Sequence, residues 1–180
     1  MKKLLVVLLL FSLAFMTTGC NSPEEELPAV GNQSENSPPA VSTEDSVFDE
    51  NGNIILDENG QIDMQAAINN IDSYTTEEVL KIAHYRDGAL ATAVNFTLGR
   101  RLLKDFDTTL SQIAMTEIPE DRGGTENLGF GMGYEIGLDL QSEAVSVEDC
   151  KILYAEHELT DSQQAVLDKI IEGFESAQNN

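Results

Sequence analysis

Two histidines and one internal cysteine are the side chains most readily assigned to chemistry. His157 follows Cys150 by seven positions, so a helix would place both side chains on one face. A zinc site needs three or four converging ligands, and His84 is the only other histidine. We therefore interpret His157 as a residue at the edge of the core, and we predict neither a metal ion nor a cofactor.

His84 opens the polar cluster His84-Tyr85-Arg86-Asp87 at an expected helix end. A histidine can act as a general base, but no nucleophile is identifiable beside it. The chain also lacks the Gly-x-Ser-x-Gly, His-Glu-x-x-His and phosphate-loop motifs. The sequence therefore predicts no catalytic residues and no enzymatic activity.

The basic residues Arg100, Arg101 and Lys104 form one cluster in a chain with few cations. In so acidic a protein, the simplest interpretation is that they pair with nearby carboxylates such as Asp105 and Asp107. Binding of an anionic ligand is the alternative.

A short tandem repeat precedes the long apolar segments. Residues 48–54 are echoed by residues 56–62, and each copy places Asn-Gly between apolar residues. This pattern predicts a pair of turns or a small hairpin over 47–63. Calcium binding is the alternative, because Asp49, Asn51 and Asn53 alternate as in an EF-hand loop. The glycine is misplaced, however, and Gly60 occupies the position of the bidentate glutamate.

The N-terminus has the features of an export signal over residues 1–19. Lys2 and Lys3 precede residues 4–16, which are apolar except for Ser12. A bilayer-spanning helix needs about 20 apolar residues, so this stretch is too short to span, but it suits a signal-peptide core. No later segment is apolar enough to stop translocation.

The signal ends in Thr17-Thr18-Gly19-Cys20, which resembles the lipobox of bacterial lipoproteins. The resemblance covers residues 1–20 only. It implies that Cys20 receives a diacylglyceryl group, becomes the mature N-terminus and anchors the protein to a bacterial membrane, facing outside the cytoplasm. An ordinary secretory signal cut at the same place is the alternative. In that case, a disulfide between Cys20 and Cys150 becomes available.

The charge balance limits the partners. The chain has 10 basic and 32 acidic residues, and its formal net charge is −22. Loss of Lys2 and Lys3 with the signal makes the mature chain still more negative. Such a protein is not expected to bind nucleic acid or to adhere electrostatically to anionic lipid. Membrane attachment would then depend on the acyl chains. The acidity favours solubility, and attraction to a basic partner is the sharper alternative.

Residues 20–46 are rich in Ser, Pro, Glu and Asn, and after Cys20 they contain no basic or aromatic residue. We expect a disordered acidic tether, because the segment cannot bury enough apolar area to offset its ordering entropy. A flexible chain of this length spans roughly 25–30 Å.

Residues 64–180 predict a single all-α bundle of five to seven helices. Apolar spacing indicates a short helix from Met64 and a long one over 89–106, with a helical turn over 110–115. The predicted capping boxes are Thr75 with Glu78, Ser146 with Asp149 and Thr160 with Gln163. The second of these would open a helix that reaches His157.

Residues 128–140 are ambiguous. Strict apolar alternation favours a strand, which would give an α+β fold with a Gly-rich strand or hairpin. Gly129, Gly133 and Gly137, however, align on one face of a helix and would admit another backbone closely. Similarity to residues 90–102 favours the helix, and we expect these two Ala/Gly-faced helices to pack together.

The sequence therefore predicts a lipid-anchored envelope protein whose helical domain binds another, unidentified envelope protein. One alternative is a lipoprotein that binds calcium or a small ligand, the latter in a cavity lined by Phe96, Phe130 and Tyr134. A second alternative is an envelope enzyme without a recognisable motif.

Overall fold

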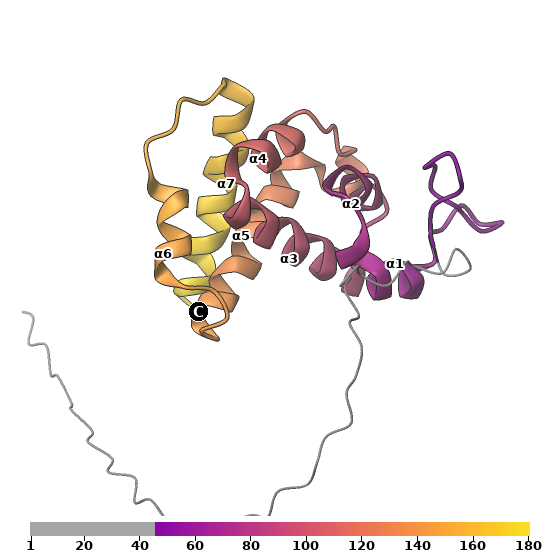
Figure 1. Ribbon diagram of the computed structural model, residues 1–180, viewed down its shortest axis with the longest axis horizontal. Helices are drawn as coiled ribbons and strands as arrows, with labels where there is room; N and C mark the ends of the chain where they lie inside the picture. The colour runs from indigo at the N-terminus through magenta and orange to yellow at the C-terminus, as the bar shows by residue number, and fades with distance from the viewer. Residues whose placement is uncertain (1–45) are drawn as a thin grey trace, which may run out of the picture. The chain divides into compact units, whose positions relative to one another are not determined.

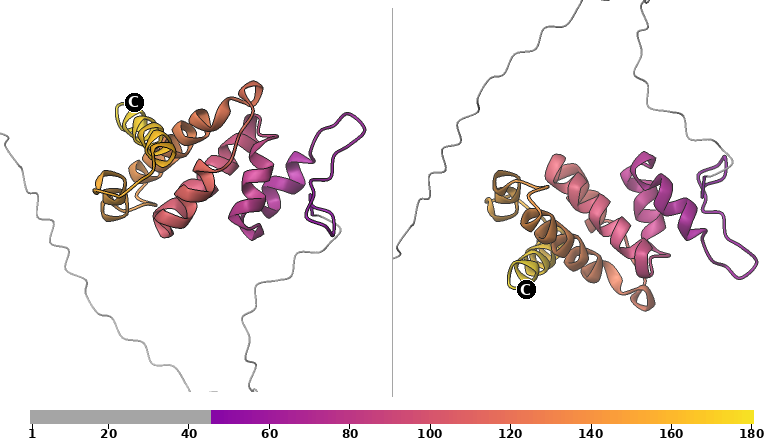
Figure 2. Two further views of the ribbon diagram at one scale, coloured as in Figure 1. Left: turned by 90° about the horizontal axis from the view of Figure 1, so that it is seen from above. Right: turned by 90° about the horizontal axis from the view of Figure 1, so that it is seen from below.

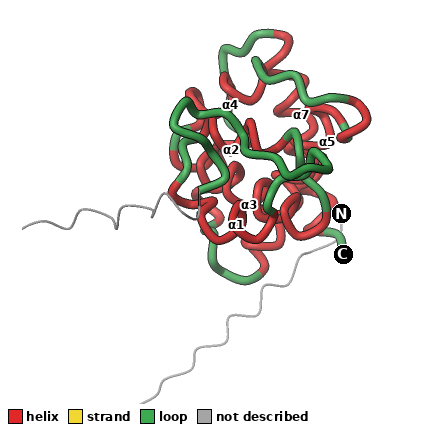
Figure 3. The backbone as a smooth tube through the Cα atoms, turned by 90° about the vertical axis from the view of Figure 1, so that its right-hand side faces the viewer, coloured by secondary structure: helices red, strands yellow, loops and turns green. Residues whose placement is uncertain are grey.

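The computed structural model describes residues 46–180. The predicted signal, Cys20 and nearly all of the predicted tether lie outside this range. The described part is all-α, as the sequence predicted, and contains seven α-helices (Figures 1 and 3). These are α1 (Met64–Asn70), α2 (Thr76–Ala83), α3 (Gly88–Lys104), α4 (Phe106–Ala114), α5 (Gly124–Gln141), α6 (Val147–Cys150) and α7 (Asp161–Gln178), with short 3-10 helices at Ile71–Ser73, Glu120–Arg122 and Lys151–Tyr154.

Helix α5 lies between α3 and α7 (Figure 2). Its contact with α7 is made backbone against backbone. A Cβ atom at Gly133 would overlap the Ile170 carbonyl, and one at Gly173 of α7 would overlap the Phe130 carbonyl. At Gly137, an added Cβ would lie 2.9 Å from the Phe174 carbonyl oxygen. Glycine is therefore required on both helices for this approach.

The helical interpretation of residues 128–140 is confirmed, and the strand alternative is wrong. The partner of the glycine face differs from the one we expected. Gly129, Gly133 and Gly137 face α7, whereas α3 packs on another side of α5 through Gly99. A Cβ at Gly99 would lie 2.9 Å from Ile136 Cγ1. The glycines repeat every four residues and so define one face, but that spacing does not specify which helix covers it.

Two predicted helix boundaries were wrong. The long helix ends at Lys104, because Asp105, with φ and ψ of −143° and 80°, is not helical, and α4 begins directly afterwards at Phe106. The helix opened by Ser146 stops at Cys150, and a 3-10 helix carries the chain to Tyr154. His157 therefore lies in the loop that precedes α7. All three predicted capping boxes are present.

The tandem repeat forms two similar turns, each closed by one antiparallel bridge, Phe48 with Ile54 and Leu56 with Ile62. In the first turn, Asp49 Oδ1 accepts hydrogen bonds from the backbone N–H groups of Asn51 (2.9 Å) and Asn53 (2.8 Å). Gly52 has a φ of 75°, which L side chains rarely adopt.

Asp57 repeats the arrangement of Asp49 in the second turn, accepting from the backbone N–H groups of Asn59 and Gln61 at 2.8 Å each. Both carboxylates thus receive N–H donors, which supports the interpretation of the repeat as turns. Within residues 46–180, no group of three or more acidic, histidine or cysteine side chains is arranged to hold a metal ion.

The turns pack against the helices through a few buried residues. Val47, Phe48 and Ile62 belong to the same hydrophobic core as the helices. The Val47 N–H donates to the Tyr74 hydroxyl at 3.2 Å, and the Phe48 and Tyr74 rings meet edge to face with centroids 5.0 Å apart. The repeat is therefore held beside α2 rather than projecting freely.

Substitution of Gly133 by Ala tests the contact between α5 and α7. Overpacking typically costs 1–3 kcal/mol, and here the obstacle is a carbonyl that side-chain motion cannot clear. We expect Gly133→Ala to lower the free energy of unfolding in urea by about 3 kcal/mol or more, despite a gain in helix propensity of about 1 kcal/mol.

Gly129→Ala is the matched control, because its added Cβ would lie 3.1 Å from the Val166 carbonyl oxygen. We expect a change within about 1 kcal/mol, since the gain in propensity offsets a small adjustment. Equal destabilisation by the two substitutions would contradict the proposed role of Gly133.

The carboxylates of the turns predict how the stability of the turns depends on pH. Hydrogen bonds from Asn53 lower the pKa of Asp49 below its usual value of 3.8. The ionised form therefore favours the folded turn, and this contribution is present above pH 3.8 and lost as the pH falls through the lowered pKa. In NMR spectra, Asp49 should titrate below 3.8, and the Asn53 amide should lose protection from exchange over the same range.

Asp49→Ala should remove protection from the Asn53 amide at neutral pH while leaving the Gln61 amide protected, and Asp57→Ala should do the reverse. If both amides remain protected in both variants, the carboxylates do not organise the turns.

Candidate functional site

The outward face of α2 carries polar residues one helical turn apart, namely Glu77, Lys81 and His84. The capping box of Thr75 and Glu78 fixes the start of the helix, with Glu78 Oε2 accepting from the Thr75 N–H at 2.7 Å. The opposite face of α2 is anchored in the core. Two cavities lie along the outward face, and a third lies beside the second turn of the repeat.

The first cavity, about 330 Å³, lies between α2 and the end of α4. Met115 at its edge is 84% exposed, whereas Leu80 in its wall is buried. The lining residues are Glu77, Leu80, Lys81, His84, Gln112, Met115 and Thr116.

The second cavity, about 360 Å³, lies between the end of α2 and the first turn of the repeat. It shares Lys81 and His84 with the first. The lining residues are Gly52, Asn53, Ile54, Lys81, His84 and Tyr85.

The third cavity, about 120 Å³, lies beside the second turn and shares Tyr85 with the second cavity. The lining residues are Gly60, Gln61, Ile62, Met64, Tyr85 and Asp87. The first two cavities share Lys81 and His84, and we call these two cavities the α2 groove.

Lys81 makes contacts on two sides of the groove. Its Nζ lies 3.3 Å from Glu77 Oε1 and donates to the Gly52 carbonyl at 3.2 Å. One side chain thus joins the outward face of α2 to the first turn. Because Lys81 and Glu77 pair, the two side chains together add little net charge to the groove.

The predicted polar cluster His84-Tyr85-Arg86-Asp87 is divided by the fold. His84 and Tyr85 line the groove, whereas Arg86 is buried and its Nη2 donates to the Gly124 carbonyl at 3.0 Å. Desolvation by burial lowers the pKa of Arg86. Asp87 caps α3, where its Oδ1 accepts from the Gly88 N–H at 2.8 Å. Two of the four residues in the cluster, Arg86 and Asp87, therefore have structural roles.

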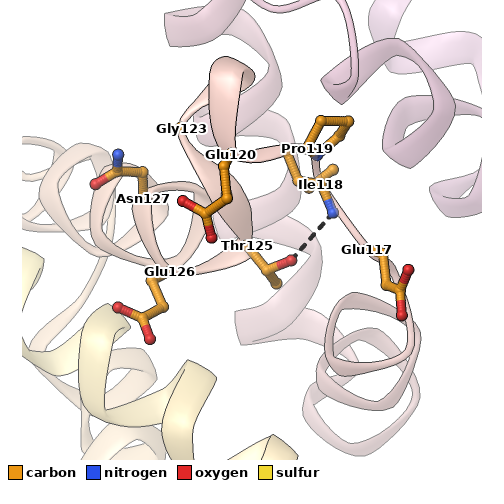
Figure 4. Close-up of a pocket in the computed structure, with 9 residues that line it drawn as sticks. Glu117, Ile118, Pro119, Glu120, Gly123, Thr125, Glu126 and Asn127 are labelled. Atoms are coloured by element: carbon orange, nitrogen blue, oxygen red, sulfur yellow. Dashed lines mark hydrogen bonds between the residues drawn. The ribbon is translucent and has the colours of Figure 1, made fainter.

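A larger cavity of about 590 Å³ lies at the start of α5 (Figure 4). Its lining includes the carboxylates of Glu117, Glu120 and Glu126, which Figure 4 shows pointing in different directions. Thr125 holds the loop, because its hydroxyl accepts from the Ile118 N–H at 3.2 Å and donates to the Thr116 carbonyl at 2.9 Å. The arrangement organises a turn and does not converge on one point.

His157 and Cys150 are not brought together into a metal site. The His157 ring stacks on Phe106 with centroids 4.1 Å apart, and its Nε2 lies 2.8 Å from the Ile152 carbonyl oxygen. Cys150 is buried in the core, and desolvation, followed by the charge of Asp149, raises the pKa of its thiol. His157 closes the loop before α7, which is a structural role.

The predicted partners of the basic cluster were wrong. Arg100 pairs with Asp139 of α5 at 3.1 Å, and its guanidinium lies 4.6 Å from the centroid of Phe96. Arg101 donates to the carbonyls of Tyr74 (2.6 Å) and Ile71 (3.4 Å). The two arginines bond to these acceptors rather than to Asp105 and Asp107, because the end of α3 packs against other elements that present acceptors.

Arg101 has a lowered pKa, chiefly because of desolvation, while the charges of Asp72 and Glu78 act in the opposite direction. Its hydrogen bonds secure the segment between α1 and α2. The aromatic residues predicted to line a ligand cavity, Phe96, Phe130 and Tyr134, line none of the four cavities described above.

The sequence contained a partial signal for the α2 groove. The turn repeat and the capping box of α2 were both identifiable, but the residues that complete the groove come from segments about 60 residues apart, from Gly52 to Thr116. Local spacing cannot reveal such a surface.

Among the helices of residues 46–180, none is both long enough and apolar enough to cross a membrane. No family model, curated protein or solved structure matches the chain.

Proposed function

We propose that the protein is an exported lipoprotein, anchored through Cys20 to the outer face of a bacterial membrane, and that its helical domain binds another envelope protein. The observation that carries this proposal is Thr17-Thr18-Gly19-Cys20 directly after a signal-peptide core. Cys20 itself lies outside the described residues.

The acyl chains are the most effective means of attachment for this protein. Its formal net charge of −22 opposes adhesion to anionic lipid. A diacylglyceryl group supplies two chains, and stable anchoring generally needs two membrane signals. An acidic spacer would then keep the helical domain away from the membrane surface.

The state of Cys150 supports lipidation of Cys20 over a disulfide. The Cys150 side chain is buried, and burial is the largest cause of its raised pKa. Because the thiolate is the species that exchanges with disulfides, a buried thiol with a raised pKa reacts poorly. Cys150 is therefore poorly suited to form a disulfide with Cys20, which favours lipidation of Cys20.

The α2 groove supports the interaction role. Its cavity between α2 and α4 combines the buried Leu80 wall with the Met115 side chain, which is 84% exposed. Exposed apolar surface bordered by polar residues is typical of protein-binding sites.

Intact-mass analysis of the protein expressed in a bacterial host tests the anchor. The wild-type chain should give a mass that starts at Cys20 and includes acyl groups. Cys20→Ala should lose the acyl mass, and Cys150→Ala, the matched control, should keep it. A wild-type mass that starts at Cys20 without acyl groups would identify a soluble secreted protein and contradict the proposal.

A further inference from the structure

We propose that Asn59, in the second turn of the repeat, is a site of spontaneous deamidation, and that the structure protects Asn51 in the first turn from the same reaction. Each asparagine precedes a glycine, Gly60 or Gly52. The two turns lie at one end of the described domain (Figures 1 and 2). This modification is independent of the proposed anchor and of the proposed interaction function.

Asparagine followed by glycine provides the two groups that this reaction needs. The backbone nitrogen of the glycine attacks the side-chain carbonyl carbon of the asparagine, and glycine has no Cβ atom to obstruct the approach. A bond forms between that nitrogen and Cγ, the bond from Cγ to Nδ2 breaks, and ammonia leaves with the proton of the glycine N–H. Water then opens the resulting five-membered imide. One product is aspartate, and the other is isoaspartate, in which the main chain runs through Cβ and Cγ.

The repeat presents this pair twice in nearly the same local sequence. Residues 49–52 and residues 57–60 both read Asp-Glu-Asn-Gly, and the residue that follows is Asn53 in the first copy and Gln61 in the second. Asn51 and Asn59 are both exposed. The intrinsic reactivity of the two pairs is therefore similar, and a difference in the folded protein must come from the structure around them.

The closed form of each turn restrains the attacking nitrogen. The Gly60 N–H donates to the Asp57 carbonyl at 3.0 Å. The Gly52 N–H donates to the Asp49 carbonyl at the same distance, 3.0 Å. The reaction therefore requires the turn to open, and its rate follows the population of the open turn.

The first turn has contacts that oppose opening. Lys81 Nζ donates to the Gly52 carbonyl at 3.2 Å and so attaches the reacting segment to α2. The bridge that closes this turn joins Phe48 to Ile54, and the buried Phe48 ring meets the Tyr74 ring edge to face. Opening the first turn would break the hydrogen bond of Lys81 and expose part of the core.

The second turn has weaker contacts around the reacting pair. Its bridge joins Ile62, which is buried, to Leu56, which is 39% exposed. A Cβ atom added at Gly60 would meet no other atom of residues 46–180 within 4 Å. The Asn59 Nδ2 donates to Asp57 Oδ2 at 3.4 Å, which is long for a hydrogen bond. The second turn should therefore open more often than the first.

Conversion of Asn59 would disrupt the second turn. Isoaspartate lengthens the main chain between Asp57 and Gln61, whose N–H donates to Asp57 Oδ1 at 2.8 Å. Aspartate replaces the amide donor of Asn59 with a second carboxylate beside Asp57. Both products weaken the hydrogen bonds that organise this turn, so the protein would lose an ordered second turn with age while the first turn remained.

Incubation of the full-length protein at mildly alkaline pH tests the proposal, with mass spectrometry that locates each converted residue. We expect Asn59 to convert about fivefold faster than Asn51 in the folded protein, a ratio within the effect of one hydrogen bond. In urea, the two should convert at similar rates because their local sequences match. Equal rates in the folded protein, or faster conversion of Asn51, would overturn the proposal. Conversion of Asn59 no faster than that of Asn53, which precedes Ile54, would also overturn it.

Lys81→Met tests the cause of the protection. We expect this variant to convert Asn51 about fivefold faster than wild type and to leave the rate at Asn59 unchanged. Lys151→Met, in the 3-10 helix after α6, is the matched control and should change neither rate. An unchanged rate at Asn51 in Lys81→Met would show that the contact with α2 does not protect the first turn.

Asn59→Gln tests the consequence for the turn, because its longer side chain must close a six-membered ring and reacts far more slowly. In aged wild-type protein, the Gln61 amide should lose protection from hydrogen exchange in proportion to conversion. In aged Asn59→Gln protein, its protection should persist. Equal loss of protection in both proteins would show that deamidation of Asn59 is not its cause.

Discussion

The close approach of α5 and α7 is the constraint on which the rest of the domain depends. At Gly133 and Gly173, the backbone of each helix occupies the space where a side chain of the other would stand. Dispersion forces and apolar burial then act over a long contact, because the two helices each contain 18 residues. The glycines lower the intrinsic helix propensity of α5, and this packing compensates for that loss.

The position of α5 also determines its contacts with α3 and with the end of α2. Its Ile136 side chain meets Gly99 of α3, and its Asp139 pairs with Arg100 of the same helix. At its start, the Gly124 carbonyl accepts a hydrogen bond from Arg86, next to the end of α2. The hydrogen bond of Arg86 therefore connects the central helix to the end of α2, and the other two contacts connect it to α3.

Local signals predicted much of this fold. Each capping box couples a side chain to a backbone N–H three residues away, so Thr75, Ser146 and Thr160 could be identified from sequence alone. The Asn-Gly turns are similarly local, because glycine readily adopts the positive φ seen at Gly52. The spacing of Gly129, Gly133 and Gly137 correctly indicated a close helical contact.

Contacts between segments that are far apart in the sequence could not be predicted from these local patterns. Arg100 pairs with a carboxylate 39 residues away, and no sequence pattern distinguished Asp139 from the nearer Asp105. The helix after Ser146 ends early, and His157 stacks on Phe106, a contact between distant segments. The α2 groove exists only after the turns, α2 and α4 have assembled, so its residues carried no joint signature.

The attachment of the first turn to the core has a mechanical consequence. The chain enters the described domain at Ser46, and the next two residues, Val47 and Phe48, are buried. Val47 is held by its hydrogen bond to the Tyr74 hydroxyl and by one that its carbonyl accepts from the Ile55 N–H at 2.9 Å. Tension arriving through the preceding residues would load these bonds before it reached any helix. The turns would separate from the helices first, and the two cavities that they line would be lost while the helical core stayed folded.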